Sequence, residues 1–401
     1  MKKINILVIG GGFGGVKAAS ELCNHSKFDV RLISDNRNFE HHPTLYRTAT
    51  GGRRAISSIP LVEIFKGKPI DLVFDTVTTI DPDKKIVKSS KNNEYRYDIA
   101  IFALGVETNY FGIAGLKEFS YGVKSLRDAE TLKMHLHEQL IDKKRLDLNY
   151  VVVGGGPTGI ELAGALPYYL NQTMKKHGIK KRSVHVDLVE GAPRLLPRMP
   201  HSVSRAVTKR LKKLDIRLFL GKPVQAETKD ALVVGGKPIR SHTVIWTAGT
   251  ANNEFFKNNK FPLSPNGRVV VDKHMQALPS IFVIGDNADT KYYGMAQRAL
   301  YDAIFVSNNI KRVNLYKVEP KNYKPKAPIS VIPAGPYWAV FVWGKLQFYG
   351  WLGWLLRRAG DWISYKDISN WWKATELSLL SDENEDQCSV CAQYDQATAD
   401  V

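Results

Sequence analysis

The chain contains very little cysteine, with three residues in 401. Three cysteines are too few for a disulfide framework, so we expect a protein of a reducing compartment. Only Cys23 falls in the body of the chain, on the first predicted helix, which argues against a disulfide reductase or a sulfide–quinone reductase. Cys388 and Cys391 form a C-x-x-C pair near the end, but no second pair of ligands accompanies it, so no metal site is predicted.

Long hydrophobic runs are also missing. No stretch of about 18 uninterrupted apolar residues is present, so no transmembrane helix is expected. The N-terminus lacks the apolar core of a secretory signal, because Lys2 and Lys3 lead directly into the buried-strand pattern INILVIGG. Helix-turn-helix, zinc-finger and RNP patterns are absent, so nucleic acid is not expected as a partner.

Acidic residues are scarce except at the C-terminus. The net charge is +18, yet the last 21 residues hold six acids and no Lys or Arg. The rest of the chain is therefore strongly basic and is expected to attract an anionic membrane surface or anionic cofactors. The alternative is that this charge mainly aids solubility. The acidic stretch at 381–401 is expected to be flexible.

Glycine, by contrast, is concentrated in two loops of the same kind. The first loop is GGGFGG at 10–15, between a predicted strand and a predicted helix. Its first glycine permits a tight turn, its second lets the backbone approach a pyrophosphate, and its third lets helix and strand pack closely. Asp35 ends the next strand at the place of a ribose-binding acid. The glycines in this G-x-G-x-x-G spacing are Gly10, Gly12 and Gly15.

The second loop, GGGPTG at 154–159, has the same strand before it and a helix after it. Its candidate acid is Glu190, more distant than usual because a basic insert lengthens the connection. A carboxylate here favours the free 2′-OH of NADH, while the nearby Arg194 leaves NADPH open. A surface glutamate at a strand end is the alternative. The spaced glycines are Gly154, Gly156 and Gly159.

Two such loops predict two dinucleotides. The natural pair is a tightly held FAD and an exchanging NADH, with hydride passing from nicotinamide to flavin. The fold class is therefore α/β, with two Rossmann-like dinucleotide-binding domains. After residue 311 the amino-acid composition changes, first to a proline-rich linker and then to a Trp-rich region.

Five segments occur in a characteristic order over roughly residues 4–310: INILVIGGGFGG, ALGVETNYFGIAGLKEF with VKSLRDA, VVVGGGPTGIELAG, VIWTAGT, and IFVIGDNA with AQRA. In these segments the chain resembles the type II, non-proton-pumping NADH:quinone oxidoreductases, within the two-dinucleotide flavoprotein superfamily. The resemblance implies an FAD domain with an inserted NAD domain. The implied boundaries are 1–115 and 256–312 for the FAD domain, 116–255 for the NAD(H) domain, 313–380 for a region of membrane association or dimerisation, and 381–401 for the tail.

The resemblance also implies roles for single residues. Asp286 in IGDNA would hydrogen-bond the flavin ribityl chain, and an N-cap or turn residue is the alternative. Gly105 in ALG and Gly249 in TAG would lie against the cofactors.

Glu161 follows the second loop, where the resemblance places it close to the meeting point of nicotinamide and flavin. The alternative is a carboxylate that only complements the helix dipole. The stretch HHPTLYR at 41–47 would contact the isoalloxazine. Its two histidines, His41 and His42, are interpreted as pocket lining or surface, since no other His or Cys supplies metal-ligand spacing.

The electron acceptor depends on an A-Q-x-A-x-Q motif that lines the quinone site in the resembled family. The chain keeps the first glutamine as Gln297, a candidate for both quinone and cofactor contact, but has Tyr301 in place of the second. Quinone reduction, with menaquinone or ubiquinone, is the predicted function of an enzyme peripheral to the cytoplasmic face of the membrane. Alternatives are a soluble NAD(P)H-dependent FAD reductase with another acceptor, such as oxygen, a ferredoxin or a sulfur compound, and a non-catalytic redox sensor.

Seven of the eight tryptophans lie between residues 338 and 372. An apolar helical stripe runs through this region, with Lys345, Arg357 and Arg358 nearby. The pattern favours a helix in a membrane interface over one in a protein core or a homodimer interface. VFVWGKLQFYGW, at its start, is open to a strand instead. The stripe consists of Phe348, Trp351, Leu352, Leu355, Ala359, Trp362 and Ile363.

Overall fold

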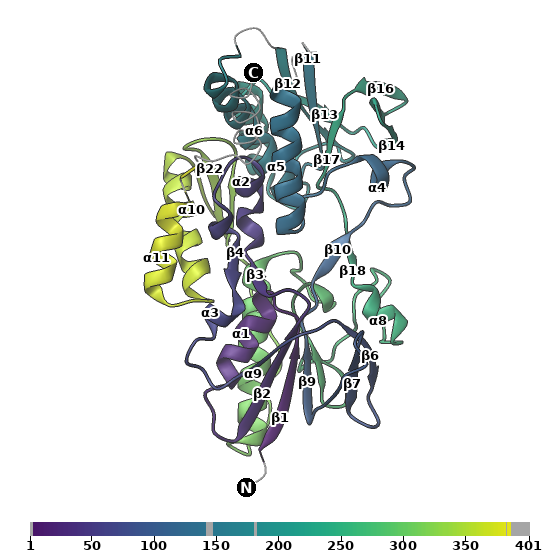
Figure 1. The fold of residues 1–401 in the computed structure, drawn as a ribbon, viewed down its shortest axis with the longest axis vertical. Coiled ribbons are helices and arrows are strands. Elements are labelled where there is room, and N and C mark those ends of the chain that lie inside the picture. The colour runs from purple at the N-terminus through teal and green to yellow at the C-terminus, as the bar shows by residue number, and fades with distance from the viewer. Residues whose placement is uncertain (1–2, 142–146, 180–182, 382, 386–401) are drawn as a thin grey trace, which may run out of the picture.

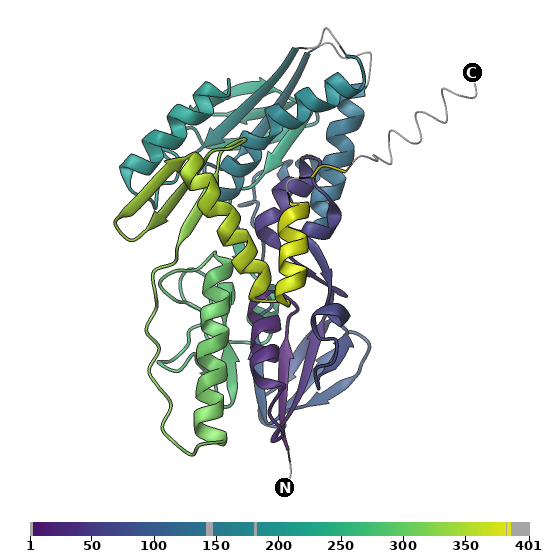
Figure 2. The ribbon, with the colours of Figure 1, turned by 90° about the vertical axis from the view of Figure 1, so that its left-hand side faces the viewer.

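The computed structural model describes residues 3–141, 147–179, 183–381 and 383–385. Two α/β units lie end to end along the long axis of the molecule (Figure 1). One unit contains the N-terminus, and the other contains the second glycine loop and its helix. The C-terminal helices run along the side of both units (Figure 2).

The first unit is built on a six-stranded sheet that takes strands from both ends of the chain. All neighbouring strands are parallel except β19 and β20, which are antiparallel. The strand INILVI is buried over most of its length, as expected of a central parallel strand. Helices α1 (Phe13–Leu22) and α9 (Ala296–Asn314) pack on this sheet. The strand order is β19 (Gln276–Leu278), β20 (Ile281–Val283), β9 (Ile99–Phe102), β1 (Ile4–Ile9), β2 (Phe28–Ser34) and β5 (Asp71–Phe74).

The second unit has a four-stranded parallel sheet. Two crossings connect it to the first unit, and they pair with each other as antiparallel strands β10 (Val106–Thr108) and β18 (Thr250–Asn252). The sheet order is β13 (Arg217–Leu220), β12 (Ser183–Glu190), β11 (Asp147–Val153) and β17 (Thr243–Trp246). Its helices are α5 (Leu126–Ile141), α6 (Pro157–Lys176) and α7 (His201–Lys213), and a meander adds β14 (Val224–Thr228), β15 (Ala231–Val234) and β16 (Lys237–Arg240).

The remaining elements are short. They are β3 (Asn38–Glu40), η1 (His42–Thr44), α2 (Leu45–Ala49), η2 (Arg54–Ile56), β4 (Ser58–Pro60), α3 (Leu61–Ile64), β6 (Val77–Asp81), β7 (Ile86–Ser89), β8 (Glu94–Arg96), α4 (Leu116–Phe119), α8 (Glu254–Asn258) and η3 (Gly285–Asn287). Among them β6, β7 and β8 form a three-stranded sheet, and β3 pairs with β4. The observed architecture confirms the expected α/β class with two Rossmann-like sheets.

The C-terminal region forms an antiparallel sheet and two helices. The sheet consists of β21 (Ser330–Pro333), β22 (Ala339–Trp343) and β23 (Leu346–Gly350). Phe348 lies on β23, so the expectation that the apolar helix includes it is wrong and the alternative of a strand holds. The strand ends at Gly350, whose φ of +75° lets the chain turn into the helix. The helices are α10 (Trp351–Lys366) and α11 (Trp371–Leu380).

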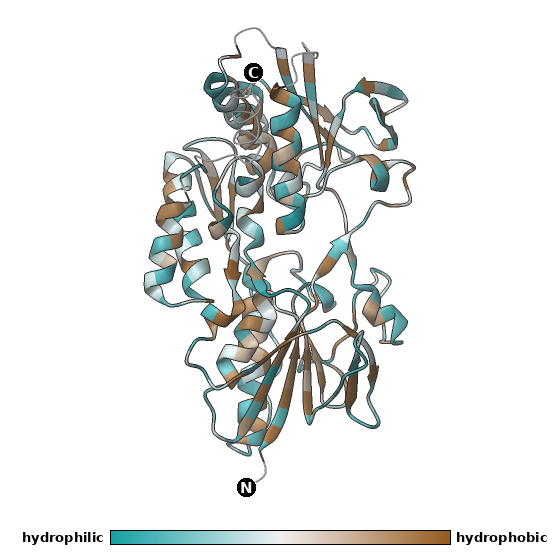
Figure 3. Cartoon of the chain, viewed as in Figure 1, coloured by the Kyte–Doolittle hydropathy of each residue, from teal (hydrophilic) through white to brown (hydrophobic). Residues whose placement is uncertain are grey.

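Helix α10 is amphipathic, but its apolar side faces outward and its polar side faces the protein. Its apolar stripe is exposed, and its buried stripe includes Arg357 and Asp361. Arg357 therefore lies in the interior, which corrects the expectation that it lies on a basic edge beside a membrane. Hydrophobic and hydrophilic positions alternate along α10 in Figure 3. The exposed residues of the stripe are Trp351, Leu352, Leu355, Ala359 and Ile363.

The described part of the acidic tail is bound to the body rather than free. Glu385 donates its N–H to the carbonyl of Gly51 at 2.9 Å, and its carboxylate pairs with Lys133 of α5. Glu383 pairs with Arg53 at 2.7 Å. The expected flexibility of the tail therefore does not extend to these first residues. Cys388 and Cys391 lie outside the described residues.

Candidate active site

The first glycine loop has the geometry that its spacing predicts. Gly10 has a φ of +112°, and a side chain there would meet the carbonyl of Ala103 at 2.2 Å. A Cβ on Gly15 would lie 1.8 Å from the carbonyl of Gly10, because helix and strand meet at that point. At Gly12 a Cβ would meet nothing within 4 Å. The backbone at Gly12 is therefore open to a ligand at the N-terminus of α1.

The second loop repeats the same arrangement. Gly154 has a φ of +119°, and a Cβ on Gly159 would lie 1.9 Å from the Gly154 carbonyl. A Cβ on Gly156 would again meet nothing within 4 Å. Each loop thus has one glycine that faces open space beside a helix N-terminus. This arrangement fits the pyrophosphate of a dinucleotide in both places.

The two candidate ribose acids differ in their surroundings. Asp35 directly follows β2, which ends at Ser34, and is exposed. Glu190 ends β12, and its carboxylate accepts the N–H of Gly155 at 2.6 Å and that of Ala192 at 2.7 Å. Glu190 is therefore fixed against the second loop, while each of its oxygens keeps a second lone pair.

The turn after β20 brings together two predicted residues of the first unit, Asp286 and Gly105. Asp286 accepts the N–H of Gly294 at 2.7 Å. Asn287 accepts the N–H of Gly105 at 2.9 Å and donates to its carbonyl, so Asn287 ties the ALG turn to the IGDNA turn. Asn287 is a site residue that the sequence analysis missed. Gly249 packs elsewhere, because a Cβ on it would lie 2.5 Å from the ring of Phe111.

Glu161 lies where three parts of the chain meet. It is buried in the first half of α6, and its carboxylate is 3.3 Å from the guanidinium of Arg357 on α10. The same guanidinium binds Asp361 at 2.7 Å and donates to the carbonyl of Pro43 at 3.2 Å. Arg357 therefore connects the helix of the second loop, the 41–47 stretch and the C-terminal region.

The surroundings of Glu161 shift the pKa of its carboxyl. Burial raises the pKa of the Glu161 carboxyl to about 7; Arg357 opposes this shift and Asp361 adds to it. Asp361 has the shorter contacts to Arg357, so the guanidinium compensates the charge on Glu161 only in part. A carboxyl with a pKa near 7 can both take up and release a proton near neutral pH.

The buried roles of Arg357, which was predicted at a membrane edge, and of Asp361 were not predicted, because the apolar stripe is the stronger pattern in the same helix. A signal was present in the spacing: Gly353, Arg357, Asp361 and Tyr365 recur every four residues on the opposite side. Four-residue spacing of an arginine and an aspartate places them together on one helix face.

The two histidines of the 41–47 stretch have different environments. His41 is buried, stacks on Tyr365 with 4.3 Å between ring centroids, and lies 2.9 Å from the hydroxyl of Ser364. Burial, assisted by Arg357, holds its pKa well below the ordinary value. His42 has an exposed side chain, and the pKa of its ring is lowered by the dense packing around it and by the charge of Lys124. Both rings are therefore neutral near pH 7.

The predicted quinone-site residues lie beneath the linker that precedes β21. The amide oxygen of Gln297 accepts the N–H of Ile329 at 2.9 Å. The ammonium of Lys326 lies 5.7 Å from the ring centre of Tyr301. Neither contact joins these residues to Glu161, so their roles toward an acceptor remain predictions.

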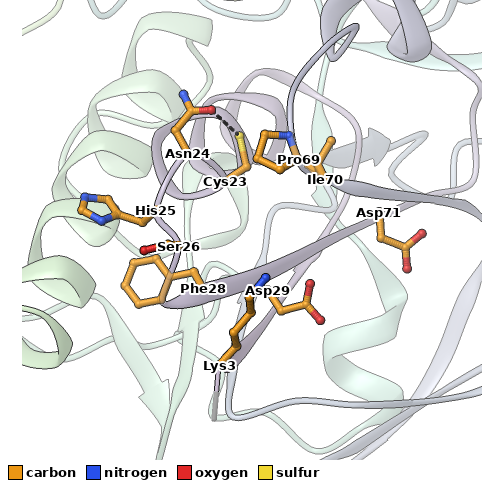
Figure 4. Close-up of a pocket in the computed structure, with 10 residues that line it drawn as sticks. All are labelled: Lys3, Cys23, Asn24, His25, Ser26, Phe28, Asp29, Pro69, Ile70 and Asp71. Carbon is orange, nitrogen blue, oxygen red and sulfur yellow. Dashed lines mark hydrogen bonds between the residues drawn. The ribbon is translucent and has the colours of Figure 1, made fainter. Parts of the chain in front are cut away.

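Cys23 lies beside a pocket of about 580 Å³ at the opposite edge of the first sheet (Figure 4). The pocket is lined by residues that precede or begin strands, such as Lys3, Phe28 and Asp71, whereas the glycine loop follows the end of β1. Cys23 caps the far end of α1, one helix length of roughly 15 Å from the loop. Within the described residues no cysteine thiol is positioned to react at the first loop.

Comparison with known proteins agrees with this geometry. The sequence pattern of the pyridine nucleotide-disulphide oxidoreductases matches residues 4–303. The chain belongs to this family. As a pyridine nucleotide-disulphide oxidoreductase it has two dinucleotide sites, for FAD and NAD(H), and the two open loops fit them.

The relatives confirm the resemblance to type II NADH:quinone oxidoreductases. The chain is 29% identical to one such enzyme, Ndh of Mycobacterium tuberculosis, over 88% of this chain and 83% of the relative. It is 26% identical to the Staphylococcus aureus enzyme over 77% and 82% of the two chains. The fold is shared with NDH2 of Plasmodium falciparum, solved with NADH, at a TM-score of 0.82 and 19% identity over 95% and 97% of the two chains. A sulfide:quinone oxidoreductase from Aquifex aeolicus also has this fold, at a TM-score of 0.78 and 20% identity over 96% and 98%.

Proposed function

We propose that the protein is a type II NADH:quinone oxidoreductase, which catalyses NADH + H⁺ + quinone → NAD⁺ + quinol. The observation that carries the proposal is Glu161, a buried carboxyl with a pKa of about 7 on the helix of the second loop. It lies beside Arg357, which also binds the carbonyl of Pro43 in the 41–47 stretch. A group able to exchange a proton therefore lies between the helix of one dinucleotide loop and the segment expected at the flavin.

The chemistry divides between cofactor and chain. Bound FAD would supply hydride acceptance from NADH and two-electron transfer to the acceptor. The open backbone at Gly12 and Gly156 would hold the two pyrophosphates, and Asp35 and Glu190 the riboses. Glu161 supplies the proton exchange that quinol formation requires.

The second site favours NADH over NADPH. Glu190 ends β12 with its carboxylate fixed beside the loop, where it suits a free 2′-OH. Arg194 is not available for a 2′-phosphate, because its guanidinium already donates to the carbonyls of Leu196, Pro197 and Met199.

The exposed face of α10 and α11 supports peripheral membrane attachment, at the cytoplasmic face. Trp371 and Trp372 stack at 3.7 Å between ring centroids and are 50% and 70% exposed. Trp351 is 63% exposed on the neighbouring helix. Tryptophan and leucine beside exposed lysines, on a chain of net charge +18, are typical of helices in an anionic membrane interface. No helix among the described residues is long and apolar enough to span a bilayer.

A turnover assay tests the proposal. The purified protein should contain bound FAD and oxidise NADH rapidly when a menaquinone or ubiquinone analogue is added. Flavin that NADH reduces but that quinone reoxidises only slowly would contradict the proposal and favour another acceptor. Glu161→Gln should retain FAD and lose most quinone-dependent turnover, and normal turnover in this variant would reject the proton role. Gln297→Ala and Tyr301→Phe test the same reaction at the acceptor side.

A further inference from the structure

Arg268 is a buried cation without an ion-pair partner. Only 5% of its surface is exposed, and among the described residues its Nη1 has no hydrogen-bond partner and no carboxylate lies within ion-pair distance. Its guanidinium lies 3.8 Å above the ring centre of Tyr293. Burial lowers the pKa of Arg268, and Asp286 and Asp289 oppose this shift without forming an ion pair. The cost of burying the charge is therefore offset only in part.

The position of Arg268 is fixed beside the IGDNA turn. The next residue, Val269, donates its N–H to the carbonyl of Asn287 at 2.8 Å and accepts that of Asp289 at 2.8 Å. Tyr293 belongs to the same turn region, since the following Gly294 donates to the carboxylate of Asp286. Arg268 therefore lies at the carboxyl end of β20, next to the residue expected at the ribityl chain.

Two further cations face the same region from the second unit. Arg198 donates to the Tyr293 hydroxyl at 3.3 Å and lies 5.2 Å from its ring centre. Lys124, just before α5, is in electrostatic contact with both Asp286 and Arg268. Burial lowers the pKa of Lys124, Asp286 opposes this shift, and Arg268 adds to it. Lys124 makes no ion pair with a described residue. Two carboxylates, Asp286 and Asp289, act on Arg268, but Asp289 is exposed, as is the opposing Arg198. Arg268 and Lys124 therefore leave a small excess of positive charge around the half-buried Asp286.

The phosphates of FAD do not account for this excess. The first loop, which is open at Gly12, follows β1, whereas Arg268 and Asp286 lie at the end of β20. The order β20-β9-β1 separates the two places by two strand spacings, or roughly 10 Å. The cations therefore face the part of a bound FAD that is distant from its pyrophosphate.

We propose that Arg268 and Lys124 hold positive charge toward the flavin ring and stabilise the negative charge that the ring acquires on reduction. They are positioning and tuning residues for the reaction proposed above, on which this inference rests. The excess of positive charge favours the reduced, anionic flavin over the oxidised, neutral one and so raises the reduction potential. Tyr293, stacked on Arg268, keeps the guanidinium in one orientation.

Sulfite binding to the oxidised flavin tests this inference without turnover, because the flavin–sulfite adduct carries the same type of negative charge as reduced flavin. Arg268→Gln and Lys124→Met should each weaken sulfite binding at least about tenfold and lower the flavin midpoint potential, at unchanged FAD content. Arg268→Lys should retain most of both properties. Arg198→Gln is the matched control, since Arg198 also contacts Tyr293 but is exposed, and it should change sulfite binding little.

The outcomes separate this inference from the proposed function. Unchanged sulfite affinity and potential in Arg268→Gln and Lys124→Met would overturn the inference while leaving the function intact. Weaker NADH binding with unchanged sulfite affinity would also overturn it, because the cations would then serve the nicotinamide dinucleotide. If Arg268→Gln fails to retain FAD, the sulfite affinity and midpoint potential of Lys124→Met, compared with those of the native protein, test the inference. A native protein without flavin would contradict the proposed function itself.

Discussion

Gly12 and Gly156 are equivalent residues in two sites that bind different ligands. A Cβ at either position meets nothing in the chain, so a side chain there leaves the fold intact and occupies only ligand space. Gly12→Val should therefore abolish FAD retention, while Gly156→Val should retain FAD and raise the KM for NADH at least about tenfold. Absorbance of the purified variants and steady-state kinetics measure both effects. Loss of FAD in Gly156→Val would contradict the assignment of the two loops.

The protonation of Glu161 should be visible in stability as well as in turnover. Its pKa is raised from 4.5 to about 7 in the folded protein, so its contribution is fully present below pH 4.5 and is lost as the pH rises through 7. The native protein should lose up to about 3 kcal/mol of unfolding free energy relative to Glu161→Gln over this interval. Denaturant titrations of both proteins between about pH 5 and pH 8 measure it. Parallel curves would show that the pKa of Glu161 is not raised.

The role of a residue could be predicted from the sequence where it is set by neighbouring residues, and not where it is set by contacts between distant segments. The glycine roles and the position of Glu190 follow from strand–loop–helix geometry within one stretch of sequence. The partner of Glu161 could not be predicted in the same way, because Arg357 is 196 residues distant in the chain. Asn287 and Arg268 are likewise defined by contacts between distant segments, and no spacing in the sequence identifies them.

At the scale of elements, α10 shows why an apolar stripe does not by itself tell which side of a helix is buried. Its charged side faces inward because Glu161 and the Pro43 carbonyl provide partners for Arg357. The strand ending at Gly350 was hard to predict for a related reason, since alternation and helical spacing overlap in VFVWGKLQFYGW. The long parallel strands and their helices, in contrast, follow from patterns that only one structure satisfies.

The outward face of α10 should bind membranes. Replacing Trp351, Leu355 and Ile363 together by serine should reduce binding to vesicles that contain phosphatidylglycerol at least about tenfold, with little change in stability, because these side chains are already exposed. Co-sedimentation with vesicles measures this. Replacing Val62 and Val270, which are 59% and 46% exposed elsewhere, is the matched control and should change nothing.

Undiminished sedimentation of the triple variant would contradict the membrane assignment. If the native protein does not sediment with vesicles and forms a dimer in solution, the exposed face of α10 is instead a homodimer interface.

At the scale of the whole molecule, the C-terminal region braces the two units. Ile332, Ala334 and Val340 of its sheet belong to the core of the second unit. Tyr365 and Leu377 of its helices belong to the core of the first. Close approach to α6 depends on Gly164, where a Cβ would lie 2.5 Å from the N–H nitrogen of Gly335. The last glycine of GGGPTGIELAG thus serves this contact rather than a cofactor.

The docked tail links the segment after α2 to helices α5 and α6. Glu383 pairs with Arg53 and Glu385 with Lys133 of α5, and Asn384 donates to Gln172 of α6 at 2.8 Å. Replacing both glutamates by glutamine should lower the unfolding free energy by about 1–2 kcal/mol at low ionic strength, and by less in high salt.

Calorimetry at two salt concentrations measures this difference. The double variant Asp83→Asn with Glu319→Gln, at exposed carboxylates without ion pairs, is the control. Equal stability at low salt of the native protein and the variant with Glu383 and Glu385 replaced would show that these contacts of the tail do not stabilise the fold.

The first sheet has a consequence for the order in which the protein forms during synthesis. Its strands β9 and β20 are neighbours, yet Phe102 and Val283 are separated by the whole second unit. The strands of the second sheet, from β11 to β17, all leave the ribosome before β20 does. The second unit can therefore complete its sheet first, while the N-terminal strands wait with the edge of β9 unpaired. FAD should accordingly stabilise a late stage of folding, after the site for NADH already exists.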